Sequence, residues 1–190
     1  MKDLEIKNEL MGMIKACGLD RMPTDAEIRE YFGNTSISGH VNSTGGIFEW
    51  AMRLGLPVKP STTSFGRENE LLVMRLLSER GYTCEKTSTR YPYDLLVNGC
   101  VKVDVKAARK SKSNGSDVYS FELAKPQQTC DVYVAVCLDD DKPQKIYIIP
   151  AHIMHGKTQL ALGVSHSKYD HYIDRWGIID QFTKAFKEII

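Results

Sequence analysis

The chain has 190 residues, of which 42% are apolar and 26% are charged, with 14 Gly and 7 Pro. This composition excludes a collagen-like, low-complexity or wholly disordered chain, and the length allows one substantial core plus a small appended module. The longest apolar runs fall far short of the roughly 20 residues that a membrane helix needs. The first residues alternate charged and apolar side chains and lack the apolar stretch of a secretory signal, so a cytoplasmic location is expected.

The net charge is close to zero, because 25 Lys and Arg oppose 24 Asp and Glu. Such a total does not by itself indicate a nucleic-acid-binding protein, although the carboxylates of a metal site would mask a basic surface in a sum over the whole chain. Five cations lie between positions 102 and 112 with only Asp104 opposing them: Lys102, Lys106, Arg109, Lys110 and Lys112. Together with the polar segment 111–116, this basic run is either a solvated loop or a loop that contacts a phosphate backbone.

Neither the cysteines nor the histidines indicate a structural zinc site. The five cysteines are an odd number without a C-x-x-C pair, which also argues against a disulfide framework. Four histidines crowd the C-terminal part of the chain, but their spacing matches no structural zinc pattern and no cysteine is close. We expect scattered surface histidines at these positions, which are His152, His155, His166 and His171.

Residues 1–60 are predicted to form a small all-helical module. Apolar residues recur at helical spacing over 4–14, and further helices are expected over 24–32, 36–41 and 47–54. Thr24 and Glu27 have the spacing of a capping box at the start of the second helix. The stretch 59–64 is polar, contains Pro60 and has no apolar periodicity, so the domain boundary is placed there, after residue 60.

Residues 61–190 are predicted to form an α/β domain, in which a mixed β-sheet is flanked by helices. A helix over 67–80 is followed by strands over 82–86, 93–97, 100–105, 118–123, 132–137 and 146–149, and a helix over 169–190 closes the chain. Asn98-Gly99, between the second and third strands, is the strongest short-range signal of a hairpin turn.

The residues that point to chemistry lie at this hairpin. Asp104 and Lys106 are two apart in one strand and therefore share a face, and the chain reversal sets Asp94 beside them. Two carboxylates next to an ammonium suit magnesium, which binds through one or two carboxylates and substrate phosphate. A lysine beside such a metal can position the attacking water and stabilise charge on the phosphate.

The pattern Asp94-x9-Asp104-x-Lys106, preceded by a helix that carries Gly66-x3-Glu70, resembles the PD-(D/E)xK nuclease superfamily over about residues 64–190. The resemblance implies a restriction-endonuclease-like core in which Mg²⁺, or Mn²⁺ as a substitute, is held by acids while the lysine assists phosphodiester hydrolysis. In the first motif a tyrosine stands between the proline and the aspartate. The implied catalytic residues are Glu70, Asp94, Asp104, Lys106 and Gln128, with Gln127 as a neighbour of the last, and the implied metal ligands are Glu70, Asp94, Asp104 and the Val105 carbonyl.

The N-terminal module has a resemblance of its own. Met22-Pro23-Thr24-x2-Glu27-Ile28, followed by the segment 45–56, is similar to the small helical repeats that accompany homing endonucleases. This resemblance implies a DNA-binding unit in which His40, Asn42 and Arg53 reach the DNA. The alternative is a helical cap that packs on the catalytic core.

Together these patterns predict a metal-dependent DNA endonuclease of the homing or restriction type. DNA is the expected partner, contacted also by Arg109, Lys110 and Lys112, and a homodimer is expected because cutting both strands requires two active sites. No membrane and no small-molecule cofactor are expected, and an enzyme encoded by a phage or mobile element would act in the host cytoplasm. Two alternatives stay open, a Holliday-junction or branched-DNA resolvase and a non-catalytic DNA-binding protein on a nuclease-like scaffold.

Overall fold

The computed structural model describes residues 3–88, 90–123 and 128–189. The chain divides into two compact units, Met1–Ser64 and Phe65–Ile190. Within the described ranges, none of the helices combines the length and the apolar character that a membrane crossing would require.

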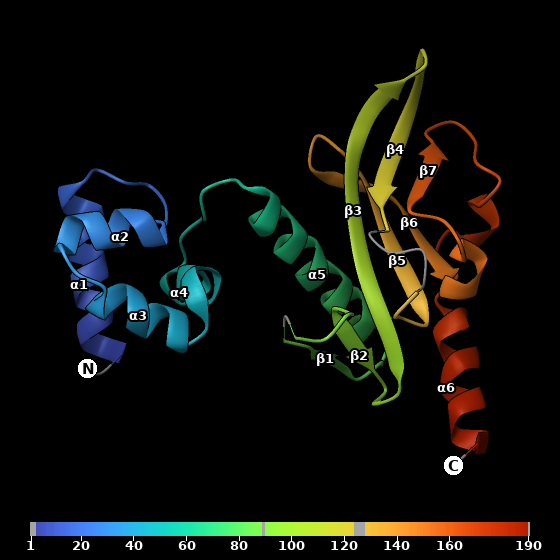
Figure 1. Ribbon diagram of the computed structural model, residues 1–190, viewed down its shortest axis with the longest axis horizontal. Helices are drawn as coiled ribbons and strands as arrows, with labels where there is room; N and C mark the ends of the chain where they lie inside the picture. Colours follow the sequence, from blue (N-terminus) through green and yellow to red (C-terminus); the bar gives the residue numbers. More distant parts are fainter. Residues whose placement is uncertain (1–2, 89, 124–127, 190) are drawn as a thin grey trace. The chain divides into compact units, whose positions relative to one another are not determined.

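Among the described residues of the first unit, four helices surround a core of their own, and they are the blue and teal helices of Figure 1. They are α1 (Asp3–Ala16), α2 (Asp25–Phe32), α3 (Ser36–Ser43) and α4 (Gly46–Leu54). The predicted capping box is confirmed, because the Thr24 side chain accepts from the Glu27 backbone N–H while the Glu27 carboxylate accepts from the Thr24 N–H. Trp50, which is 2% exposed, anchors the core, and its indole N–H donates to the Thr44 hydroxyl.

The second unit begins with α5 (Thr62–Glu79), whose first residues belong to the preceding unit, and ends with α6 (Gly177–Ile189). Between them lie seven strands and two short 3₁₀ helices among the described residues. The strands are β1 (Cys84–Lys86), β2 (Leu95–Val97), β3 (Val101–Ser113), β4 (Ser116–Glu122), β5 (Val132–Asp139), β6 (Lys142–Pro150) and β7 (Gln159–Gly163), and the 3₁₀ helices are η1 (Ala151–Met154) and η2 (Asp170–Tyr172).

The long strand β3 organises the sheet (Figure 1). Its first part pairs with β2 antiparallel and with β5 parallel, and its last four residues pair with β4 instead. β6 continues the sheet beyond β5, β1 extends it beyond β2, and β7 pairs with β4. The predicted α/β class with a mixed sheet is confirmed.

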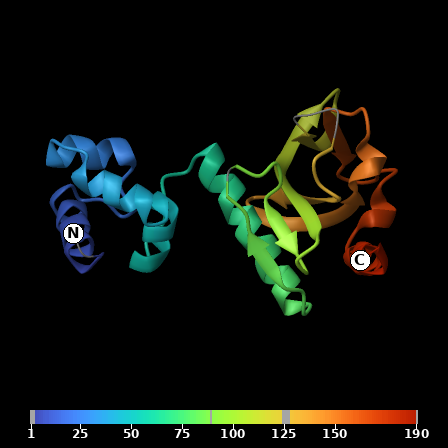
Figure 2. The same cartoon turned by 60° about the horizontal axis from the view of Figure 1, so that its bottom comes forward.

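Two apolar layers cover the two faces of this sheet. Val101, Val103 and Val105 face α5 and α6, which Figure 2 shows beside the strands. Side chains from β4, β7 and η1 cover the opposite face of β5 and β6. Because side chains alternate along a strand, Asp104 and Lys106 lie on the face opposite the three valines.

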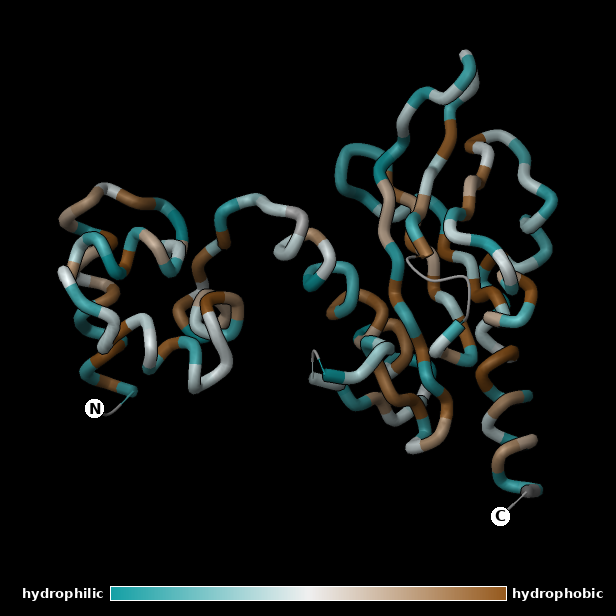
Figure 3. The backbone as a smooth tube through the Cα atoms, viewed as in Figure 1, coloured by the Kyte–Doolittle hydropathy of each residue, from teal (hydrophilic) through white to brown (hydrophobic). Residues whose placement is uncertain are grey.

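Three predictions about elements were wrong. The segment 111–116 is not a loop, because β3 runs to Ser113 and β4 starts at Ser116, with Asn114 and Gly115 as a two-residue turn at φ +49° and +80°. Polar side chains are acceptable on both faces of this exposed ribbon, whose tip is hydrophilic in Figure 3. β7 was not predicted. The last helix begins at Gly177, since Ile173 pairs with Tyr147 of β6 and Asp174, at φ +51°, turns the chain.

Candidate active site

The two aspartates of the predicted hairpin lie side by side. The β2–β3 pairing begins with Leu95 opposite Val103, and the side chain of Asp94, directly before β2, lies next to that of Asp104. The Asp94 backbone N–H donates to the Val103 carbonyl at 3.0 Å, and its carboxylate Oδ2 accepts from the Val105 backbone N–H at 2.8 Å. The Asp94 side chain therefore bonds to the β3 backbone directly before β2 begins.

The turn that creates this pairing follows from its residues. Asn98 and Gly99 have φ angles of +52° and +69°, a region in which asparagine and glycine are the least strained residues. The Cys100 N–H donates to the Val97 carbonyl and closes the turn. The Asn98 side chain also accepts from the Thr83 N–H and donates to the Thr183 hydroxyl, so the turn is tied to both the start of β1 and α6.

Burial and the neighbouring Asp104 carboxylate raise the pKa of Asp94 to about 6, while the Val105 N–H and the Lys106 ammonium act in the opposite direction. Two carboxylates this close repel each other when both are ionised. The pair is therefore a place where a cation lowers the electrostatic energy.

The ammonium group of Lys106 supplies positive charge next to the two carboxylates. Its Nζ lies 2.7 Å from Asp104 Oδ1, and the two side chains are 26% and 14% exposed. Within a strand the N–H and C=O of one residue point to the same side, so the Val105 carbonyl faces the Asp94 side of β3. The structure thus brings together three of the predicted site residues, Asp94, Asp104 and Lys106, and the predicted backbone ligand.

Glu70 approaches this group from α5. It lies one turn before the buried Val73 on the face that covers the sheet, and it lines the same hollow of about 200 Å³ as Asp94. Its Oε2 is 2.7 Å from Lys86 Nζ, on β1. Glu68, the alternative acid of this helix, lines a different hollow together with Phe65.

Glu70 is therefore near the aspartates but engaged with Lys86. Among the residues that the structure describes, no group of three His, Cys, Asp or Glu side chains is close enough to hold one metal ion. Asp94 is the acid that is near both of the others, because its side chain lies next to that of Asp104 and lines the same hollow as Glu70.

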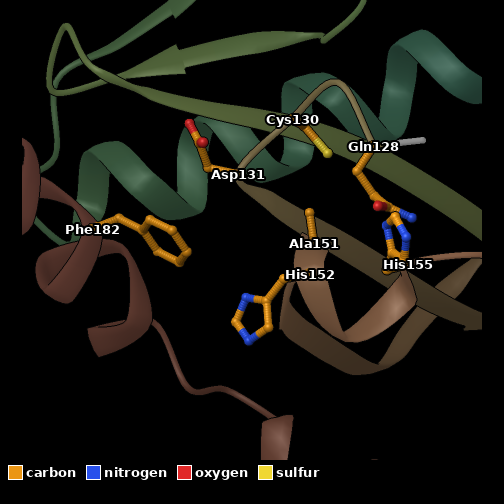
Figure 4. Close-up of a pocket in the computed structure, with 7 residues that line it drawn as sticks. All are labelled: Gln128, Cys130, Asp131, Ala151, His152, His155 and Phe182. Carbon is orange, nitrogen blue, oxygen red and sulfur yellow. The ribbon is translucent and has the colours of Figure 1, made fainter.

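Gln128 lies elsewhere. Its side-chain amide donates to the Met154 carbonyl, and it lines a separate hollow of about 400 Å³ with Asp131, His152, His155 and Phe182 among others (Figure 4). The structure therefore does not bring Gln128 into the hollow of Glu70 and Asp94. Gln127 lies outside the described residues.

The other two histidines of the C-terminal segment have local neighbours. His166 Nδ1 lies 3.2 Å from Asp170 Oδ2, and the His171 ring packs on Tyr172 with ring centroids 4.0 Å apart.

The basic residues in the last part of β3 lie on both faces of the strand, because consecutive side chains alternate. Arg109 pairs with Asp141 of the β5–β6 turn at 2.6 Å, and Lys110 pairs with Asp139 at the end of β5 at 2.5 Å. Lys112 is exposed near the tip of the hairpin. A phosphate would have to compete with these two aspartates for Arg109 and Lys110.

In the helical unit, the three predicted DNA contacts are all engaged with acids. His40 Nε2 lies 2.7 Å from Asp3 Oδ1, Arg53 pairs with both Asp3 and Glu49, and Asn42 donates to Asp25. Except for the Arg53–Glu49 pair, which lies within α4, these bonds join different helices of the unit.

Sequence reasoning did not assign a role to the other residues that line the hollow of Glu70 and Asp94, called the acidic hollow below. They are Arg67, Lys86, Thr87, Ser88, Tyr91 and Tyr93. A signal existed for Lys86, because it ends the strand predicted before the hairpin, and pairing places it opposite Leu95, next to Asp94. Arg67 and Tyr91 depend on how α5 and the loop before Asp94 pack, which no local pattern reveals.

Comparison with known proteins gives a match in structure alone. No protein-family model matches the sequence, and no curated protein matches it. Among solved structures, the chain is similar to a bacterial homing endonuclease, I-Ssp6803I, with a TM-score of 0.58 and 22% sequence identity over 70% of this chain and 100% of that chain. At this identity the match shows a shared fold.

Proposed function

We propose that this protein is a metal-dependent endonuclease that hydrolyses phosphodiester bonds in DNA at specific sites. The observation that carries the proposal is the pair Asp94 and Asp104, side by side on a β-hairpin with Lys106 2.7 Å from Asp104. Support comes from the fold, which is shared with a homing endonuclease, and from the resemblance of Glu70, Asp94, Asp104 and Lys106 to the PD-(D/E)xK pattern.

The donor set fits a divalent cation such as Mg²⁺, with Mn²⁺ as a substitute. Two carboxylates and a backbone carbonyl are hard oxygen ligands, and the raised pKa of Asp94 reflects a repulsion that a cation would relieve. Asp94, Asp104 and the Val105 carbonyl would hold the ion, and Glu70 would join them by exchanging Lys86 for it. When bound, the cation would polarise the phosphoryl group and make a water molecule more acidic.

Lys106 has the second role in this proposal. Its ammonium is held by Asp104 and only partly exposed, so its charge is less screened than that of a surface lysine. It orients the attacking water or stabilises the negative charge that grows on the phosphate. Because Asp104 fixes its position, little reorganisation is needed during the reaction.

The proposed partners are DNA and a second copy of the chain. Arg109, Lys110 and Lys112 would contact the phosphate backbone along the β3–β4 hairpin, and His40, Asn42 and Arg53 would contribute after releasing their acidic partners. Gln128 would act from the neighbouring hollow. Cutting both strands needs two sites, which a homodimer provides.

Cleavage of supercoiled plasmid and of branched DNA, each with Mg²⁺ or with a chelator, tests the proposal. We expect the wild-type protein to produce nicked or linear plasmid with Mg²⁺ but not with the chelator, and we expect no cleavage by Asp104→Asn. Asp140→Asn is the matched control, because Asp140 lies in the exposed β5–β6 turn at φ +48°, where asparagine is equally suitable. Binding without cleavage by the wild-type protein would support the non-catalytic alternative, and preferential cutting of branched DNA would support a resolvase.

A further inference from the structure

Two tyrosines line the acidic hollow next to the aspartates. Tyr91 is 57% exposed, and its ring centroid lies 5.6 Å from that of Tyr93, with the rings tilted by 50°. Tyr93 precedes Asp94 in the chain and packs against the apolar layer on the Asp104 face of the sheet. A large, exposed aromatic ring is thus held directly beside the proposed catalytic carboxylates.

The backbone around these rings is fixed by hydrogen bonds. The Thr87 N–H and hydroxyl both donate to the Asp94 carbonyl, at 2.9 Å and 3.0 Å, and close the base of the loop. The Thr129 hydroxyl donates to the Pro92 carbonyl at 2.8 Å, and the Tyr91 N–H donates to the Ser88 carbonyl at 3.0 Å. Because these bonds hold the described residues of the loop before any ligand arrives, binding costs less conformational entropy.

The surroundings favour part of a polyanion over a free small molecule. Arg67 and Lys86 line the same hollow, and Lys102 Nζ lies 6.0 Å from the Tyr93 ring centroid. The volume of about 200 Å³ is below the roughly 300–1,000 Å³ of sites that enclose a whole small molecule. One aromatic group carried on a charged backbone matches both the size and the charge.

We propose that Tyr91 and Tyr93 form a stacking subsite for one nucleobase that has left the base stack beside the scissile bond. This inference rests on the proposed function and narrows its substrate to DNA that is unpaired or strongly kinked at the cleavage site. A base in an intact duplex already has both faces covered by its neighbours, so only an unstacked base can pack on a tyrosine. Arg67 and Lys86 then meet the flanking phosphates.

Binding without cleavage tests the subsite. The probes are fluorescent single-stranded oligo(dT) and a fully paired duplex of the same length, titrated by anisotropy with the full-length protein in a chelator. Tyr91→Ala should lose roughly tenfold or more in affinity for oligo(dT) and less than about twofold for the duplex. Tyr91→Phe keeps the ring and should match the wild type. Tyr31→Ala removes a similarly exposed tyrosine, 47% exposed, from the helical unit and should change neither affinity.

Equal losses by Tyr91→Ala on both probes, or a loss by Tyr91→Phe as large as that by Tyr91→Ala, would overturn the stacking subsite. The plasmid assay is read separately. If Tyr91→Ala loses affinity for oligo(dT) and not for the duplex, but the wild-type protein does not cut the plasmid, only the proposed nuclease activity is overturned. Wild-type cleavage with no effect of Tyr91→Ala on oligo(dT) binding would overturn the subsite alone.

Discussion

At the scale of single residues, Asp94 is subject to opposing influences. Burial and the Asp104 carboxylate favour its neutral form, and the Val105 N–H and Lys106 favour the carboxylate, with a resulting pKa of about 6. A cation can bind only to the ionised form, so protons and metal compete for Asp94 near neutral pH.

The concentration of Mg²⁺ needed for half-maximal cleavage should therefore depend on pH. Below pH about 6 it should rise by up to about tenfold for each pH unit, because Asp94 must first lose a proton, and above that it should level off. The measurement is a Mg²⁺ titration of plasmid cleavage at a series of pH values. A requirement that stays constant through this range would contradict the assigned role of Asp94.

The same raised pKa predicts a stability change in Asp94→Asn. Between the ordinary value of 3.8 and about 6, the folded protein binds more protons at Asp94 than the unfolded chain, so stability falls as pH rises through this window and the cost is complete above it. Asparagine carries no charge and can still accept from the Val105 N–H. In chelator at pH 8 the variant should be more stable by about 1–2 kcal/mol, after allowance for solvent screening.

Urea denaturation at pH 8 and below pH 4 measures this effect, and the gain should vanish at the lower pH. Asp94→Asn should also lose cleavage, so that stability and activity change in opposite directions. A variant that is less stable than the wild type at pH 8 would show that the Asp94 carboxylate is a favourable structural contact.

Lys106→Ala should slow cleavage by at least roughly 100-fold under single-turnover conditions, since one positioned charge near the reacting phosphate is lost. Lys106 also lowers the pKa of Asp94. In this variant, the pH below which the required Mg²⁺ concentration rises should therefore move to a higher value. Lys187→Ala, which removes an exposed lysine of α6, is the control and should cleave as the wild type does. If Lys106→Ala cleaves normally and the pH dependence of its Mg²⁺ requirement is unchanged, Lys106 is only a lysine on a solvated surface.

At the scale of elements, the β2–β3 hairpin sets the geometry of the site. Its turn contains two residues with positive φ, and β2, with three residues, is too short to hold the register without that turn. The bonds from Asn98 to Thr83 and Thr183 connect the turn to the rest of the unit.

Gly99→Ala should destabilise the protein by about 1–2 kcal/mol, because a Cβ at φ +69° is strained although no neighbour lies within 4 Å of it. Gly66→Ala is a control with the opposite expected sign. Gly66 lies inside α5 with open space around it, so alanine should stabilise by about 0.5–1 kcal/mol. Thermal unfolding of both variants is the measurement, and equal shifts in the same direction would contradict the role of the turn.

At the scale of the whole molecule, charge is divided unevenly between the two units. Residues 1–64 carry seven Lys and Arg against eight Asp and Glu, a formal charge of −1, and residues 65–190 carry eighteen against sixteen, a formal charge of +2. The helical unit also commits His40 and Arg53 to Asp3. We therefore infer that most phosphate contacts come from the α/β unit.

A fragment of residues 61–190 should fold and should retain nearly the full salt dependence of DNA binding. Starting at Ser61 keeps the bonds that Ser61 and Ser64 exchange at the start of α5. The slope of log affinity against log salt reports the number of phosphates neutralised, and it should differ from the full-length value by less than about one contact. A much shallower slope for the fragment would show that the helical unit supplies phosphate contacts.

The sequence by itself determined the features that depend on neighbours along the chain. Asn98-Gly99 predicts the chain reversal that brings Asp94 close to the stretch from Val103 to Lys106. The exact register came from the structure, because three residues, 98–100, separate the paired Val97 and Val101. Thr24 and Glu27 likewise determine the start of α2 within three residues. The same local logic would have revealed the Asn114-Gly115 turn.

Only the tertiary structure decided the partners that lie far apart in sequence. The parallel pairing of β3 with β5, the contact of Glu70 with Lys86, and the separation of Gln128 from the acids all depend on how buried surfaces fit together. Such contacts are selected by the packing of the whole unit, since each requires closing a long loop before its own energy is gained. For the same reason, the exposed ring of Tyr91 becomes a candidate base-binding group only once its loop is folded against Asp94.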